Sequence, residues 1–208
     1  MNYNYDDQKE TLKTIHKVLK DTNFLDKMHI SIGTLLGAVR QKKLNTSASF
    51  NNWDDIDFSV NEQHYDEFKD TIVPELIKEG FHIEHAWMTS FGKIGEVTLY
   101  KGTNRLDVNI LFKHSIENEN YYLHCHWYGD IQLLKGLSAD YYENLKIIEL
   151  DGLDFYGPKN AEKYLEDCYG EDWRTPTKSK DEYKYWEDSP GIPWWNKTKF
   201  CKMLKGLD

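Results

Sequence analysis

Two aspartates in the segment Trp53–Phe58 have the spacing of a divalent metal site. Asp55 and Asp57 flank the apolar Ile56, so on a β-strand both carboxylates project from one face while Ile56 enters the core. Two like charges on one face repel each other, and a divalent cation relieves that repulsion. Mg²⁺ typically takes one or two protein carboxylates, together with waters and substrate phosphates. The pair predicts a site for Mg²⁺ or Mn²⁺, with a solvated acidic strand end as the alternative.

A glycine turn precedes this pair in the chain. The segment His29–Ile32 predicts a short strand that ends at Gly33, and the apolar residues that follow have helical spacing, so a helix is expected to begin near Thr34. The first N–H groups of a helix are suited to bind a phosphate, and a glycine lets the ligand approach closely. Gly33 and Thr34 are therefore candidate phosphate contacts, and an ordinary strand-to-helix turn is the alternative.

A third carboxylate, Asp107, lies within the apolar alternation of the segment Arg105–Phe112. This alternation places Asp107 on the face opposite the core residues. If its strand neighbours that of Asp55, Asp107 reaches the site and acts as general base for an acceptor hydroxyl or as third metal ligand. Its position alone leaves both roles open, and a solvent-facing aspartate on an edge strand is the alternative.

A second cluster of metal-ligand types is His124, Cys125 and His126. Histidine and cysteine bind Zn²⁺, and on a strand the two histidines share a face. No second pair of ligands at a recognisable spacing completes such a site, so we interpret these residues as structural.

The elements that must position these residues indicate an α+β fold. Helical spacing predicts a helix over residues 7–20, capped by Asp6 or Asp7, and a later one closed near Gly80. The residues between 41 and 52 predict a mobile loop. We expect a mixed β-sheet flanked by helices, with the site at strand ends. Further predicted elements are strands over 55–60, 81–85, 96–100 and 105–112, a helix over 65–76, a hairpin around Asp151 and Gly152, and a short helix ending at Gly170.

Length and charge limit the organisation and the partners of the chain. At 208 residues we expect one domain over residues 1–208, with 177–208 as a C-terminal extension. A formal charge of −9 argues against nucleic acid as a partner. The sequence shows neither a signal peptide nor a membrane span, and its 3 cysteines are widely spaced, so a cytoplasmic protein without disulfides is expected.

Three ordered motifs resemble the LicD/fukutin family. They are GTLLGAVR at Gly33–Arg40, WDDIDFSV at Trp53–Val60 and YGEDWRTP at Tyr169–Pro176. The resemblance implies a nucleotidyltransferase-like fold and a metal-dependent phosphotransferase. Such an enzyme moves phosphocholine or an alditol phosphate from a CDP-linked donor to a glycan or glycolipid hydroxyl. We expect it to act in the biosynthesis of a surface polysaccharide, lipopolysaccharide or teichoic acid.

The resemblance also implies roles for individual residues. Asp55 and Asp57 match the metal-binding pair of the family, and Asp107 matches its later carboxylate, which is proposed to act as base. Gly33 and Thr34 would then face the donor phosphates. Arg40 and Arg174 are candidate phosphate contacts, because guanidinium pairs well with phosphate oxygens. The loop QKKLNTSASFNN departs from the basic, glycine-containing and proline-containing stretch of many members, which puts donor contacts from this loop in doubt.

Two other functions fit the same residues. One is a nucleotidyltransferase that attaches a nucleoside monophosphate and releases pyrophosphate. The other is a non-catalytic protein that binds glycans or nucleotides. The basic and aromatic tail from Pro193 to Lys205 either lies on an anionic membrane, as a peripheral contact, or packs onto the domain.

Overall fold

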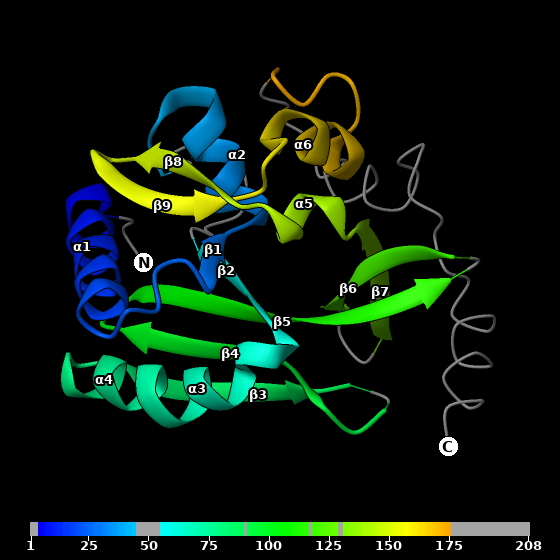
Figure 1. Cartoon of the computed structure of the whole chain (residues 1–208). Coiled ribbons are helices and arrows are strands. Elements are labelled where there is room, and N and C mark those ends of the chain that lie inside the picture. The colour runs from blue at the N-terminus through cyan, green and yellow to red at the C-terminus, as the bar shows by residue number, and fades with distance from the viewer. Residues whose placement is uncertain (1–3, 45–54, 90, 117, 129–130, 176–208) are drawn as a thin grey trace.

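The computed structural model describes residues 4–44, 55–89, 91–116, 118–128 and 131–175. Figure 1 shows a central β-sheet with α1 at one end, α3 and α4 along its lower edge, and α2, α6 and the β8–β9 hairpin above it. The helices are α1 (Tyr5–Asp21), α2 (Ile32–Gln41), α3 (Tyr65–Glu67), α4 (Val73–Lys78), α5 (Asp140–Glu143) and α6 (Ala161–Tyr169). A 3₁₀ turn, η1 (Glu62–His64), precedes α3, and a π-helical turn, η2 (Phe68–Ile72), joins α3 to α4.

The sheet is mixed, which confirms the predicted α+β fold. Its main path runs β1-β2-β5-β4-β3, and β6 and β7 extend it from the second half of β5. The pairing of β2 with β5 is parallel and the other pairings are antiparallel. The strands of this sheet are β1 (Met28–Ile30), β2 (Ile56–Asn61), β3 (His82–Met88), β4 (Ile94–Lys101), β5 (Asn104–Ile116), β6 (Glu119–Tyr128) and β7 (Ile131–Ser138). The strands β8 (Lys146–Leu150) and β9 (Leu153–Gly157) form a separate hairpin.

Alternating residues divide the central strands into an apolar face and a polar face. Phe58, Leu99 and Val108 belong to a single core that also contains Leu12 and Ile15 of α1. Burial of each such side chain contributes roughly 1.5–3 kcal/mol. The neighbouring positions on the same strands point to the opposite face, because successive side chains alternate across a strand. The core therefore fixes which residues line the polar face.

Most predicted elements are confirmed, with local differences at their ends. The predicted cap of the first helix is wrong, because Asn4, two residues earlier, accepts a hydrogen bond from Asp6 N–H at 3.1 Å. The strand before Gly33 ends at Ile30, and α2 begins at Ile32. The patterns did not predict β6, β7 or α5. In β6, four consecutive residues from Tyr122 to Cys125 are buried, so alternation is lost.

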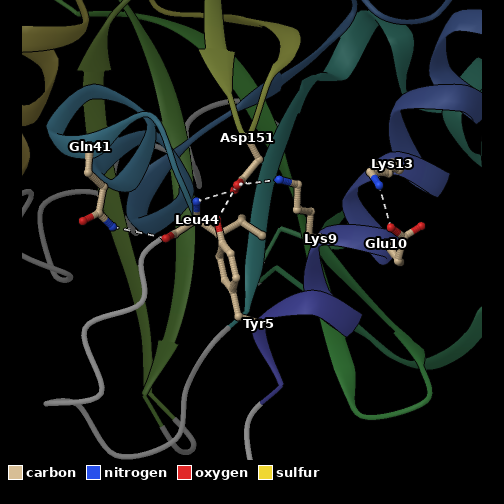
Figure 2. Close-up of polar contacts among 7 residues, drawn as sticks. All are labelled: Tyr5, Lys9, Glu10, Lys13, Gln41, Leu44 and Asp151. Carbon is tan, nitrogen blue, oxygen red and sulfur yellow. Dashed lines mark hydrogen bonds and ion pairs between the residues drawn. The ribbon is translucent and has the colours of Figure 1, made fainter.

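Asp151 ties the β8–β9 turn to other parts of the chain through its carboxylate and through its backbone N–H, which donates to the carbonyl oxygen of Lys42 at 2.9 Å. Figure 2 shows this carboxylate facing α1 and the segment after α2. It accepts hydrogen bonds from the hydroxyl of Tyr5 and from the backbone N–H of Leu44, the latter at 2.9 Å, and forms an ion pair with Lys9 at 3.6 Å. Its side chain is only 1% exposed. Asp151 thereby fixes Leu44, the last described residue before the segment that leads to Asp55.

We expect Asp151→Ala to lower the free energy of unfolding by about 3 kcal/mol, because it leaves the Leu44 N–H without its acceptor and removes a partner of Lys9. Asp151→Asn should cost roughly 1 kcal/mol, since it keeps one acceptor oxygen and asparagine tolerates the left-handed conformation at φ 52°. Urea unfolding measures both. The control is Asp154→Ala, an exposed aspartate of the same hairpin, and a loss equal to that of Asp151→Ala would contradict the role.

Candidate metal centre

Three carboxylates converge on the polar face of the sheet. Asp55 immediately precedes β2, Asp57 is the second residue of β2, and Asp107 lies opposite Asp57 in the parallel register with β5. Each offers a carboxylate oxygen, and these atoms lie within 4.8 Å of one another. Asp57 and Asp107 are 8% and 6% exposed. The structure thus brings together the three aspartates named from the sequence, in a group able to hold a metal ion.

The turn between β1 and α2 holds Asp57 from two sides. The N–H of Gly33 donates to Asp57 Oδ2 at 3.1 Å, and the Asp57 N–H donates to Thr34 Oγ1 at 2.8 Å. At the first residue of α2, Ile32 adopts a φ of 46°, which is rare for a β-branched residue. Such strain persists only where the surroundings enforce it. The contacts of Gly33 and Thr34 are with the carboxylate residue itself, and their role at donor phosphates stays a prediction.

Asp107 is oriented by two donors on one of its oxygens. Thr98 Oγ1 donates to Asp107 Oδ1 at 2.7 Å, and Arg105 Nε donates to the same oxygen at 2.9 Å. Thr98 lies opposite Asp107 in the pairing of β4 with β5. These two donors leave the second carboxylate oxygen for the interior of the site. They fix the carboxylate of Asp107 without occupying all of it.

A fourth carboxylate, Glu96, lies beside this group. Its Oε1 is 3.3 Å from Thr98 Oγ1 and 3.9 Å from Arg105 Nη2, and the residue is 7% exposed. Motif reasoning did not identify Glu96, Thr98 or Arg105. Alternation in Ile94–Lys101 places Glu96 and Thr98 on one face, but their proximity to Asp107 depends on a strand register that one sequence does not reveal.

Burial and mutual repulsion disfavour the ionised forms of three of these carboxylates. Burial raises the pKa of Asp55 from 3.8 to about 7, and the charge of Asp107 adds to this rise. Burial, followed by the charges of Asp55 and Asp107, raises the pKa of Asp57 well above 3.8. Burial, with the charge of Asp107, raises the pKa of Glu96 to about 7. Within the described ranges, these four carboxylates thus face one guanidinium, that of Arg105, an imbalance that a divalent ion would offset.

The two arginines named as phosphate contacts lie in a different contact network. Arg40, in α2, donates to the carbonyl oxygen of Trp173. Arg174 forms an ion pair with Glu162 at 2.7 Å, and its guanidinium lies 4.3 Å from the centre of the Trp173 ring. In the structure both arginines fasten the segment after α6 to the helices. Their contact with donor phosphates stays a prediction.

The remaining sequence-based candidates lie apart from this centre or outside the described residues. His124 and Cys125 are buried in β6, and within the described ranges neither belongs to a group of three close metal ligands. The side chain of His126, most of the loop before Asp55 and the tail from Pro193 lie outside what the structure describes. In the described part of the chain, no helix is both long and apolar enough to cross a membrane.

The raised pKa values predict that Mn²⁺ binding stabilises the protein more as pH rises. Below about pH 4 the folded and unfolded forms are both protonated at these groups. Between about pH 4 and 7 the folded protein retains protons that the unfolded chain has released, so the metal-free protein loses stability as pH rises. A cation must displace these protons, and its affinity therefore increases over the same window.

Thermal unfolding with and without Mn²⁺ tests this. A hundredfold excess of Mn²⁺ over its dissociation constant at about pH 8 should raise Tm by roughly 5–10 °C, and the same concentration should have a smaller effect near pH 5.5. Asp57→Asn should lose most of the shift. The exposed Asp66, whose side chain is 88% accessible, gives the matched control Asp66→Asn, which should keep it. An equal Tm shift in both variants would mean that the metal binds at another site.

Gly33→Ala should separate metal binding from stability. A Cβ at this position would lie 3.1 Å from Asp57 Oδ2, so the carboxylate must move by a few tenths of an ångström. Alanine is a better helix former than glycine by up to about 1 kcal/mol, so the fold should be unaffected or slightly more stable. Titration with Mn²⁺, followed by calorimetry, should show weaker binding than in the wild type. Unchanged affinity would mean that Gly33 does not set the position of this carboxylate.

Comparison with known proteins places these residues within one family. The family model described as LicD/FKTN/FKRP, nucleotidyltransferase domain, matches residues 26–160, which is more than half of the 208 residues. This span contains Gly33, Asp55, Asp57 and Asp107 and ends before α6. No curated protein matches the chain. The motifs at Gly33–Arg40 and Trp53–Val60 lie within the match and the one at Tyr169–Pro176 lies outside it; the resemblance to the family is confirmed, and the chain belongs to the LicD/FKTN/FKRP family.

Proposed function

We propose that this protein transfers a phosphorylated group, such as phosphocholine or an alditol phosphate, from a CDP-linked donor to a glycan hydroxyl and releases CMP. Membership in the family indicates a transferase that modifies glycans by phosphotransfer. The proposal of a metal-dependent transfer from a CDP-linked donor rests on the group formed by Asp55, Asp57 and Asp107. Their carboxylate oxygens lie within 4.8 Å of one another. This arrangement suits a divalent ion and a diphosphate better than a covalent intermediate.

Asp55 and Asp57 would hold Mg²⁺ or Mn²⁺ in this reaction. The bound ion supplies charge neutralisation for the donor diphosphate and for CMP as the leaving group. The N–H of Gly33 donates to Asp57 Oδ2 and so helps to hold this carboxylate in position. Asp55 is partly buried, and the positive charge of Arg105 lowers the cost of ionising it. Together these residues preorganise negative charge where the metal is needed.

Asp107 would act on the acceptor. Thr98 and Arg105 both donate to its Oδ1, and the other oxygen would take the proton of the attacking hydroxyl. The acceptor oxygen then forms a bond to phosphorus, the bond from phosphorus to the CMP oxygen breaks, and the proton resides on Asp107. Alternatively, the same oxygen is a third metal ligand. The partners we propose are therefore a CDP-activated small molecule and a glycan or glycolipid, with no nucleic acid.

The proposal is tested by CMP release from CDP-choline, CDP-ribitol, CDP-glycerol and CDP-ethanolamine with mixed glycan acceptors and Mg²⁺ or Mn²⁺. We expect CMP from one donor, and loss of at least about 100-fold in Asp57→Asn, since removing a metal ligand removes electrostatic stabilisation of the transition state. Asp66→Asn is again the control. Release of pyrophosphate from nucleoside triphosphates instead would favour a nucleotidyltransferase, and binding without turnover would favour a non-catalytic protein.

Asp107→Asn decides between the two roles of Asp107. If Asp107 is the base, this variant should bind Mn²⁺ nearly as well as the wild type and lose transfer by about 100-fold or more. If Asp107 is a metal ligand, the affinity for Mn²⁺ should fall together with the rate. Calorimetric titration of the metal and the rate of CMP release, measured on the same preparation, distinguish these outcomes.

A further inference from the structure

The polar face of the sheet is closed at one end and open at the other. One residue from each of five neighbouring strands forms a row across this face, as the strand register shows. Exposure rises along the row from 0% at β1 to 41% at β3. In order, the residues are His29 (0%), Ser59 (2%), Asn109 (2%), Glu96 (7%) and Trp87 (41%). At the closed end the ring of Tyr142, from α5, packs on His29 with 5.0 Å between centroids. A ligand therefore reaches the face from β3.

A β-bulge in β3 brings the aromatic side chain to this face. Ile83 pairs with Leu99 of β4, whereas His85 already pairs with Thr98, so Glu84 is an extra residue in the strand. With regular pairing, Ala86 would lie opposite Glu96, and Trp87 would point to the apolar side of the sheet. Bulges near active sites commonly redirect a side chain in this way. The bulge thus places Trp87 opposite Glu96, on the face that carries the carboxylates.

Trp87 packs against a neighbouring ring and remains accessible as an aromatic surface. The ring of His85 packs against it at 5.0 Å between centroids and an interplanar angle of 64°. An aromatic side chain that remains 41% exposed next to a polar site offers a large flat area for a ligand. The surroundings are acidic, since Glu96 lies opposite Trp87 and Asp107 lies two strands away. A neutral ligand with an apolar face suits them better than an anionic one.

We propose that Trp87, supported by His85, binds a sugar ring of the acceptor glycan, an inference that rests on the proposed function. Across the sheet Asp107 lies between Asp57 on β2 and the open side at β3. The acceptor therefore approaches Asp107 from β3, opposite to the metal pair. Two strand spacings of about 4.8 Å separate β5 from β3. At this distance, either the sugar stacked on Trp87 or the sugar linked to it can present the attacking hydroxyl to Asp107.

The test compares Trp87→Ala and Trp87→Phe with Ile83→Ala. Ile83 is similarly exposed (48%) on the same strand but pairs on the apolar face. In the CMP-release assay Trp87→Ala should raise the KM for the glycan acceptor by about tenfold, with far less change in the KM for the donor. Trp87→Phe should recover most of the loss, and Ile83→Ala should match the wild type. A rise confined to the donor KM, or equal effects of Trp87→Ala and Ile83→Ala, would overturn the subsite.

A measurement of sugar binding in the absence of turnover tests this inference independently of the proposed function. Saturation-transfer NMR with methyl glycosides of glucose, galactose, N-acetylglucosamine and N-acetylgalactosamine reports ring contact even if no donor yields CMP. Signal from at least one glycoside with the wild type and Ile83→Ala, but not with Trp87→Ala, supports the subsite. Absence of signal from all four with the wild type, or its persistence in Trp87→Ala, refutes it. Matching Tm values for the variants exclude unfolding as the cause.

Discussion

The repulsion among buried carboxylates is the constraint on which the rest of the structure depends. Asp55, Asp57, Asp107 and Glu96 are confined to one patch of the sheet, and the raised pKa values of Asp55, Asp57 and Glu96 reflect how poorly that patch tolerates charge. The fold must therefore hold these carboxylates in position and supply hydrogen-bond donors to them. Gly33 and Thr34 supply them to Asp57, and Thr98 and Arg105 to Asp107. Few sheet faces carry such a concentration of acid without a cation to match it.

This constraint is met through contacts between distant parts of the chain. Asp57 and Asp107 are brought together by the parallel pairing of β2 and β5, with α3, α4, β3 and β4 in the connection between them. The orienting residues Thr98 and Arg105 come from the β4–β5 pair. No local segment assembles the site, so the site exists only when the sheet is complete. Its formation is coupled to global folding, because long-range strand pairs form together with the core.

The sequence predicted the parts of the site whose residues follow local rules. The spacing of Asp55 and Asp57 and the alternation around Asp107 indicate their faces without knowledge of strand order. Glu96 and Arg105 required the register between β4 and β5, which one sequence does not show. Ile32 adopts a conformation that its β-branched side chain disfavours, and the bulge at Glu84 reverses the simple alternation that would place Trp87 on the core side. These departures from local rules lie next to the site, where tertiary contacts override propensity.

The bulge in β3 has a consequence for how such an enzyme changes its substrate during evolution. A strand with period two exchanges its faces whenever one residue is gained or lost. Loss of Ala86, with the bulge retained, would turn Trp87 to the core side and present Met88 opposite Glu96 instead, while β2 and β5 with their carboxylates keep their pairing. Because β3 is an edge strand, such a slip disturbs a single ladder. Acceptor preference can thus diverge by length changes in one outer strand, independently of the chemistry at the centre.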